Sequence, residues 1–256
     1  MGILTPKEAR ASFARGLDRP TAGMCPGFAQ ANLVALPERY AFDFLLFAQR
    51  NPKPMPLLDV VAPGETSPIA PGNLATELPR YRVFRSGELI EEVGDASEVW
   101  RDDLVTFLIG CSFTFEQALI EAGIDIAHIS QCVNVPMFAT SVPTRPAGIF
   151  SGPLVVSMRP IPASQVADAV RITSRYPSVH GAPVHVGDPE QIGIRDLSQP
   201  DYGEAVEIPE GTIPVFWACG VTPQAALAQA KADLVITHAP GRMLITDAPD
   251  HRYLIP

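Results

Sequence analysis

The chain has 256 residues, of which 46% are hydrophobic and 18% charged, and its formal net charge at pH 7 is −9. This length is enough to bury a core, and an acidic balance without a block of Lys or Arg argues against a nucleic-acid-binding surface. The 27 prolines are about twice the usual share of ~5% and predict many pinned turns.

Targeting signals and membrane spans are not expected. No apolar stretch approaches the ~20 residues of a membrane span, and the N-terminal segment carries Glu8 and no apolar signal-peptide region. We therefore expect a cytoplasmic protein that does not enter membranes. The four cysteines form no CxxC pair, so free thiols are expected in a reducing compartment.

The first hundred residues predict helices, a loop and a hairpin. Residues 6–16 and 37–49 have apolar residues at helical spacing and a proline in the first turn. Between them, residues 21–33 (TAGMCPGFAQANL) are rich in Gly and small polar residues and are expected to be a loop. Residues 81–93 predict a hairpin that turns at Ser86-Gly87.

Three strand–helix units are expected further along the chain. Residues 104–129 predict an apolar strand, a turn, a helix capped by Thr114 and a second strand. Residues 153–187 predict strand, helix and strand, followed by a polar loop over 187–206. Residues 213–246 again predict strand, turn, helix and strand. The apolar strands are typical of a parallel sheet with both faces covered.

Two of these units repeat each other. The stretches GCSFTFEQAL and ACGVTPQAAL align Cys111 with Cys219 and Thr114 with Thr222, both at an offset of 108 residues. The agreement of local structure on both sides predicts an internal duplication of a strand–Cys–turn–helix unit.

The repeat points to a site. A cysteine at the end of a parallel strand lies where open α/β sheets place their sites, and the unpaired N–H groups of the following helix favour a thiolate or a substrate carboxylate. We expect Cys219 and Cys111 to be catalytic if the two units face each other. The alternative is that both thiols simply pack beneath the helix entrances. The expected substrate-binding residues of the repeat are Ser112, Thr114, Glu116, Thr222 and Gln224.

Other candidates lie at the ends of predicted strands. His238 is placed to partner Cys219, and His185 and Asp188 could converge at one strand end as further catalytic groups. Their spacing with His180 matches no metal signature, so neither a metal nor a cofactor is expected. The alternative for both site histidines is a structural role. Arg159 suits a carboxylate, with a surface ion pair as the alternative. Asn134 and Asp201 complete the expected substrate-binding set.

Long motifs across the chain resemble one family. They include GAPVHVGDPEQIGIRDLSQPDYGEAV, PVFWACGVTPQ, THAPGRML and TAGMCPGFAQANLVALP, and they are similar to the D-glutamate cyclase-like family, whose bacterial members are labelled hydro-lyases. The resemblance implies a three-layer α/β sandwich with a smaller inserted α+β portion. We assign the main domain to 1–134 plus 206–256 and the inserted domain to 135–205. The resemblance also implies an activity related to mitochondrial D-glutamate cyclase, which converts D-glutamate into 5-oxo-D-proline and water.

Three functions stay open at this point. The first is a cofactor-free hydro-lyase, a carbon–oxygen lyase acting on a small dicarboxylic amino acid or hydroxy acid such as D-glutamate. The second is a cofactor-independent racemase or epimerase that uses the two thiols. The third is a non-catalytic protein that binds an acidic metabolite. Each has a small-molecule carboxylate as its partner, and a homodimer is one possible assembly on base rates.

Overall fold

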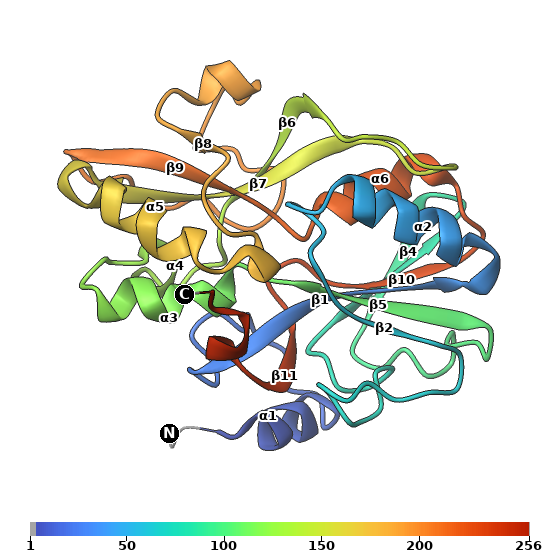
Figure 1. The fold of residues 1–256 in the computed structure, drawn as a ribbon. Helices are drawn as coiled ribbons and strands as arrows, with labels where there is room; N and C mark the ends of the chain where they lie inside the picture. The colour runs from blue at the N-terminus through green and yellow to red at the C-terminus, as the bar shows by residue number, and fades with distance from the viewer. Residues whose placement is uncertain (1–3, 256) are drawn as a thin grey trace.

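The computed structural model describes residues 4–255, which form two β-sheets and a set of short helices (Figure 1). Within these residues the first sheet has seven strands: β1 (Phe28–Pro37), β2 (Leu57–Val61), β3 (Tyr81–Arg85), β4 (Glu88–Val93), β5 (Leu104–Gly110), β10 (Val235–His238) and β11 (Leu244–Pro249). The second sheet has four: β6 (Met137–Pro143), β7 (Pro153–Pro162), β8 (His185–Val186) and β9 (Thr212–Ala218).

Six α-helices are present in residues 4–255, and only α1 among them begins with a side-chain cap. They are α1 (Pro6–Phe13), α2 (Glu38–Arg50), α3 (Phe113–Glu121), α4 (Ala127–Ser130), α5 (Val166–Ser174) and α6 (Thr222–Ala230). Helix α1 begins with a capping box, in which the Thr5 hydroxyl accepts from the Glu8 N–H and the Glu8 carboxylate accepts from the Thr5 N–H. No helix among residues 4–255 is both long and apolar enough to cross a membrane.

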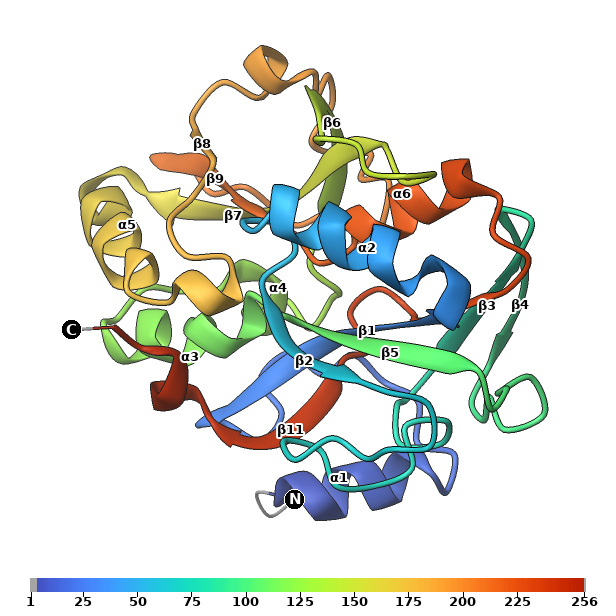
Figure 2. The same cartoon turned by 45° about the vertical axis from the view of Figure 1, so that its right-hand side comes forward.

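The fold has three layers, as expected. In both views α2, α3, α5 and α6 lie between the two sheets, whereas α1 lies outside the first sheet beside β11 (Figures 1 and 2). The strand order is β2-β5-β1-β10-β3-β4 in the first sheet, with β11 also paired to β1, and β6-β7-β9-β8 in the second. An aromatic group of Phe44, Phe47, Phe107 and Phe150 fills the space between α2 and the first sheet.

The repeat in the sequence is also a repeat in the structure. Strand β1 pairs with β5, and Ala31 lies opposite Gly110, the residue before the first cysteine. Strand β7 pairs with β9, and Val156 lies opposite Ala218, the residue before the second cysteine. Strands β5 and β9 are offset by 108 residues, and helices α3 and α6 then follow at an offset of 109 residues. The predicted duplication of a strand–Cys–turn–helix unit is thus confirmed.

The two repeated helices exchange sheets. Helix α3 follows β5 of the first sheet, but its Phe115 packs with Trp217 of the second sheet beside α5. Helix α6 follows β9 of the second sheet, but its Leu227 packs with Val34 of the first sheet beside α2. The chain therefore crosses between the sheets at both cysteine turns, which brings those turns to the centre of the molecule.

Two expectations about strands were wrong. All paired strands in residues 4–255 are antiparallel rather than parallel. Strand β5 is apolar because both of its faces are covered, with Leu108 in one hydrophobic cluster and Phe107 in the other, and this needs no parallel neighbours. The first half of β1 lies in the segment 21–33 that was expected to be a loop, because its polar Gln30 and Asn32 interrupt the apolar pattern of a central strand.

Other expectations met mixed results. The hairpin at 81–93 is confirmed, with Ser86 and Gly87 both at positive φ. The strand expected after α3 is instead the short helix α4. The division into a main domain and an insertion at 135–205 stays a prediction, although β9 pairs with β7 and so extends the second sheet to Ala218.

Candidate active site

The two repeated cysteines lie together. Cys111 and Cys219 are 6% and 8% exposed and belong to one hydrophobic cluster with Val155 and Met243. Each sulfur accepts a hydrogen bond from the backbone N–H two residues later, at an N–S distance of 3.5 Å in both turns. The helix entrances thus direct a donor at each thiol, as the sequence suggested.

Burial nevertheless keeps both thiols protonated. Desolvation raises the pKa of Cys219 to about 11, although the N–H of Val221 and the charge of Arg159 act in the opposite direction. Desolvation raises the pKa of Cys111 further. At neutral pH both groups are therefore S–H donors, and the expected thiolate is not their resting state.

The two threonines of the repeat fasten helix entrances to strands. The Thr114 hydroxyl accepts from the Gln30 N–H at 3.1 Å, and the Thr222 hydroxyl accepts from the Val155 N–H at 3.1 Å. Thr222 also donates to the carbonyl of Cys219 at 2.7 Å. Thr114 was expected to cap α3, and this expectation was wrong. The helix already begins at Phe113 and has no side-chain cap.

Arg159 and Glu116 form a buried ion pair beside the Cys111 turn. The Arg159 Nε donates to Glu116 Oε1 at 3.0 Å, and Nη2 donates to Ser112 Oγ at 3.0 Å and also to Glu116. Nη1 donates to Ser157 Oγ at 3.1 Å. Burial pulls the pKa of Glu116 upward, but the neighbouring His128 and Arg159 outweigh burial and hold it below its usual value. In this state Arg159 orients the Cys111 turn and is not free for a substrate carboxylate.

His238 does not partner Cys219. Side chains alternate along a strand, so His238 shares a face of the first sheet with Ile236, while α6 covers the opposite face. Its Nδ1 accepts from the Leu33 N–H at 3.2 Å, and burial lowers its pKa to about 4. No hydrogen bond within residues 4–255 joins it to a cysteine. Gln224 contacts the backbone of His238 and not its ring, because Nε2 of Gln224 donates to the His238 carbonyl at 2.9 Å.

His185 and Asp188 converge, but away from the cysteines. The His185 Nε2 donates to the backbone carbonyl of Asp188 at 2.6 Å, and the Asp188 carboxylate accepts from the Glu190 N–H. The His185 ring packs 5.7 Å from Phe216, which belongs to a different hydrophobic cluster from the thiols. These residues stabilise a turn, and residues 4–255 contain no group of three or more His, Cys, Asp or Glu side chains suited to a metal ion.

Asn134 and Asp201 line a polar pocket of about 310 Å³, which neither cysteine lines. Arg82, Arg242 and Tyr202 line it too, and Tyr202 packs against the cysteine cluster. None of these three residues was among the site residues expected from the sequence. Tyr202 and Arg242 lie in two of the motifs that resemble the family, so those motifs could have indicated them as site residues. Arg82 lies in the hairpin at 81–93, where no motif marks it.

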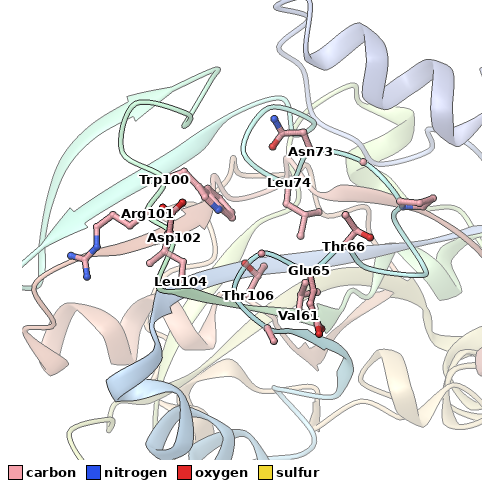
Figure 3. Close-up of a pocket in the computed structure, with 14 residues that line it drawn as sticks. Val61, Glu65, Thr66, Asn73, Leu74, Trp100, Arg101, Asp102, Leu104 and Thr106 are labelled. Atoms are coloured by element: carbon pink, nitrogen blue, oxygen red, sulfur yellow. The ribbon is translucent and has the colours of Figure 1, made fainter.

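A larger pocket of about 530 Å³ lies on the other face of the first sheet (Figure 3). Trp100, Leu74 and Thr106 surround it, and Leu74 belongs to the cluster on the face away from α6. Arg101 at its rim is bound to Asp103. None of the residues expected in a site lines this pocket, so we place the candidate active site at the smaller pocket, which we call the arginine pocket.

Comparison with known proteins places the chain among close relatives. The family model described as D-glutamate cyclase matches residues 105–247, which include both cysteine turns. "Putative hydro-lyase cu1581" of Corynebacterium urealyticum is 65% identical over 99% of this chain and 97% of that protein. "Putative hydro-lyase" of Saccharopolyspora erythraea is 63% identical over 99% of this chain and 100% of that protein.

One solved structure is weakly similar. It is the nitrogen repressor-like protein MJ0159 from Methanococcus jannaschii, with a TM-score of 0.40 and 9% identity over 91% of this chain and 92% of that chain. A likeness of this size carries no argument about the chain.

Proposed function

Because the chain belongs to the D-glutamate cyclase family, we propose that it is a hydro-lyase that binds a small dicarboxylic amino acid, with D-glutamate as the first candidate. The observation that carries the proposal is the arginine pocket, which is lined by two guanidinium groups and by Tyr202, a residue that packs against the cluster of the two buried thiols.

The arginine pocket suits a zwitterion with two carboxylates. Arg82 and Arg242 are bound to Glu92 and Asp18 at 2.7 and 2.6 Å. A guanidinium has five N–H donors, so each of the two arginines can also donate hydrogen bonds to a substrate carboxylate. Asp201 and Glu204 at the same pocket supply negative charge for an ammonium group. The volume of about 310 Å³ is at the lower end of small-molecule sites, roughly 300–1,000 Å³.

The proposed cyclisation balances without a cofactor. The substrate ammonium gives a proton to a pocket carboxylate, and the amine nitrogen attacks the side-chain carboxyl carbon. A C–N bond forms and a C–O bond breaks. The nitrogen loses two protons in all and the departing oxygen gains two, so that water leaves. We assign Cys219 as the donor of one of these protons on its position, because Tyr202 of the pocket packs against the cluster that holds this thiol and burial keeps the thiol protonated at neutral pH.

The direct test is product formation from purified protein. With D-glutamate we expect 5-oxoproline, followed by chromatography, and we expect Arg242→Gln to raise KM by about 10–100-fold through loss of a charged hydrogen bond. Arg171→Gln is the matched control, because Arg171 is exposed on α5 and pairs with Asp168. Thermal stabilisation by D-glutamate without any product would instead support the metabolite-binding function.

A second candidate is favoured by the thiol pair itself. Two cysteines in one cluster, each with an N–H donor at 3.5 Å, would suit proton exchange on opposite faces of an α-carbon, as in a two-thiol racemase. This function predicts incorporation of deuterium at the α-carbon in heavy water. Either Cys111→Ser or Cys219→Ser should abolish the exchange, and exchange that persists in one of these variants would exclude a two-thiol mechanism.

A further inference from the structure

Asn32 is a buried polar residue in the middle of the central strand β1. It is 2% exposed, and its neighbours Leu33 and Val34 are fully buried. Because side chains alternate along a strand, Asn32 lies on the same face as Val34, which packs in the layer between the sheets. An amide at such a place is costly unless its polar atoms are used.

The amide nitrogen of Asn32 holds the turn of the first cysteine. Nδ2 donates to the Gly110 carbonyl at 2.8 Å and to the Ile109 carbonyl at 3.3 Å. These are the last two residues before Cys111. Since a carbonyl can only accept, these contacts also fix which end of the amide is the NH₂ group.

The same amide packs against the turn of the second cysteine. A Cβ atom at Gly220, the residue after Cys219, would lie 2.0 Å from Asn32 Nδ2 and 2.4 Å from Oδ1. The φ angle of Gly220 is not positive, so this position needs glycine because of the close contact alone. The equivalent residue of the first repeat is Ser112, which Arg159 binds instead. Asn32 therefore contacts both cysteine turns.

We propose that Asn32 is a positioning residue that fixes the two thiols relative to each other, through a hydrogen bond to one turn and a packing contact with the other. The role rests on the proposed function, because the spacing of the thiols matters when both face one bound molecule. Its test requires no turnover and so separates the two proposals.

The test is site-resolved thiol alkylation of the full chain, followed by peptide mass spectrometry with iodoacetamide as the probe. Asn32→Asp keeps the side-chain shape but places an oxygen against the Gly110 carbonyl, and Asn32→Leu removes the hydrogen bond altogether. In both variants we expect Cys111 and Cys219 to react about tenfold faster than in the wild type, because loss of one buried contact opens both turns locally.

Two controls, the alkylation rate of Cys25 and the variant Gln30→Leu, distinguish a positioning role of Asn32 from a general loss of stability. Cys25 is also buried, but its sulfur donates to the Leu4 carbonyl beside α1, far along the chain from the repeat, and its rate should stay within about twofold of the wild-type rate. The control variant is Gln30→Leu, which removes a buried amide on the same face of β1 that binds the Thr21 carbonyl. It should leave both repeat cysteines unchanged.

The proposal is overturned if only one or neither of the two thiols accelerates, or if Cys25 accelerates equally. If Asn32→Leu does not fold, Asn32→Asp alone decides the result. Failure of the wild-type protein to form 5-oxoproline would count against the proposed function and would leave this measurement intact.

Discussion

The two thiols are held by different chemistry, although their turns are repeats of each other. The Cys111 turn is bound through Ser112 by Arg159, which is fully buried and lies 5.3 Å from the centre of the Trp217 ring. The Cys219 turn has glycine at the equivalent place and packs on a neutral amide. The charge of Arg159 lowers the pKa of both thiols, whereas the charge of Glu116 raises the pKa of Cys111 alone, so the two halves are electrostatically unequal.

The first prediction concerns the buried ion pair. Arg159→Met should lower the free energy of unfolding by about 3–5 kcal/mol, because it leaves the Glu116 carboxylate buried without its main partner. The double variant Arg159→Met/Glu116→Gln should recover most of this loss. Urea denaturation measures both, and the exposed Arg171→Gln should change stability by less than about 0.5 kcal/mol. Equal stability of the single and double variants would show that the orphaned carboxylate is not the cause.

At the scale of elements, the cysteine turns are the points where the chain passes from one sheet to the other. Each helix leaves the sheet of its own strand and packs on the opposite sheet. One threonine hydroxyl attaches each helix entrance to the sheet of its own strand, Thr114 to β1 of the first sheet and Thr222 to β7 of the second. The threonines therefore hold each helix entrance to the sheet that the chain is leaving, and they are not side-chain helix caps.

The second prediction follows from this equivalence. Thr114→Val and Thr222→Val should each lower the free energy of unfolding by about 1–3 kcal/mol, because each leaves a buried strand N–H without an acceptor. The loss at Thr222 should be the larger of the two, because its hydroxyl also donates to the Cys219 carbonyl at 2.7 Å. Thr76→Val should be close to neutral, because the half-buried Thr76 hydroxyl makes only a long bond of 3.4 Å to the Asn73 carbonyl. A large cost in only one repeat would mean that the hydroxyls are not equivalent. Serine variants should retain most of the stability in both.

For the whole molecule, local patterns predicted local features and failed where distant pairing decides. Helical spacing placed α1 and α2, and the repeat identified two turns whose cysteines, Cys111 and Cys219, belong to one hydrophobic cluster. Strand direction could not be read, because an apolar strand covered on both faces looks the same in either sheet type. The sheet face on which His238 lies depends on the residue at which β10 begins to alternate, and the sequence does not show this residue. Strand β1 was missed because the polar Gln30 and Asn32 find hydrogen-bond partners only in the folded chain.

The last prediction concerns stability against pH. His180 and His238 are both buried, and burial lowers the pKa of each to about 4, whereas an unfolded histidine titrates near ~6.5. The unfolded chain therefore binds more protons between these values, so the free energy of unfolding must fall as pH drops from about 6.5 towards 4, by up to roughly 3 kcal/mol for each histidine. The lowered pKa of Glu116 adds a loss only below its ordinary value of ~4.3.

The interval between about pH 6.5 and 4.5 consequently isolates the two histidines. Urea denaturation at pH 7, 5.5 and 4.5 should show a stability that declines over this interval. His180→Gln and His238→Gln should each be less stable at pH 7 but lose less on acidification, because a neutral amide binds no proton in either state. His251→Gln, on the exposed surface, should keep the wild-type slope. A wild-type stability that stays flat down to pH 4.5 would contradict the burial of neutral imidazoles on which this prediction depends.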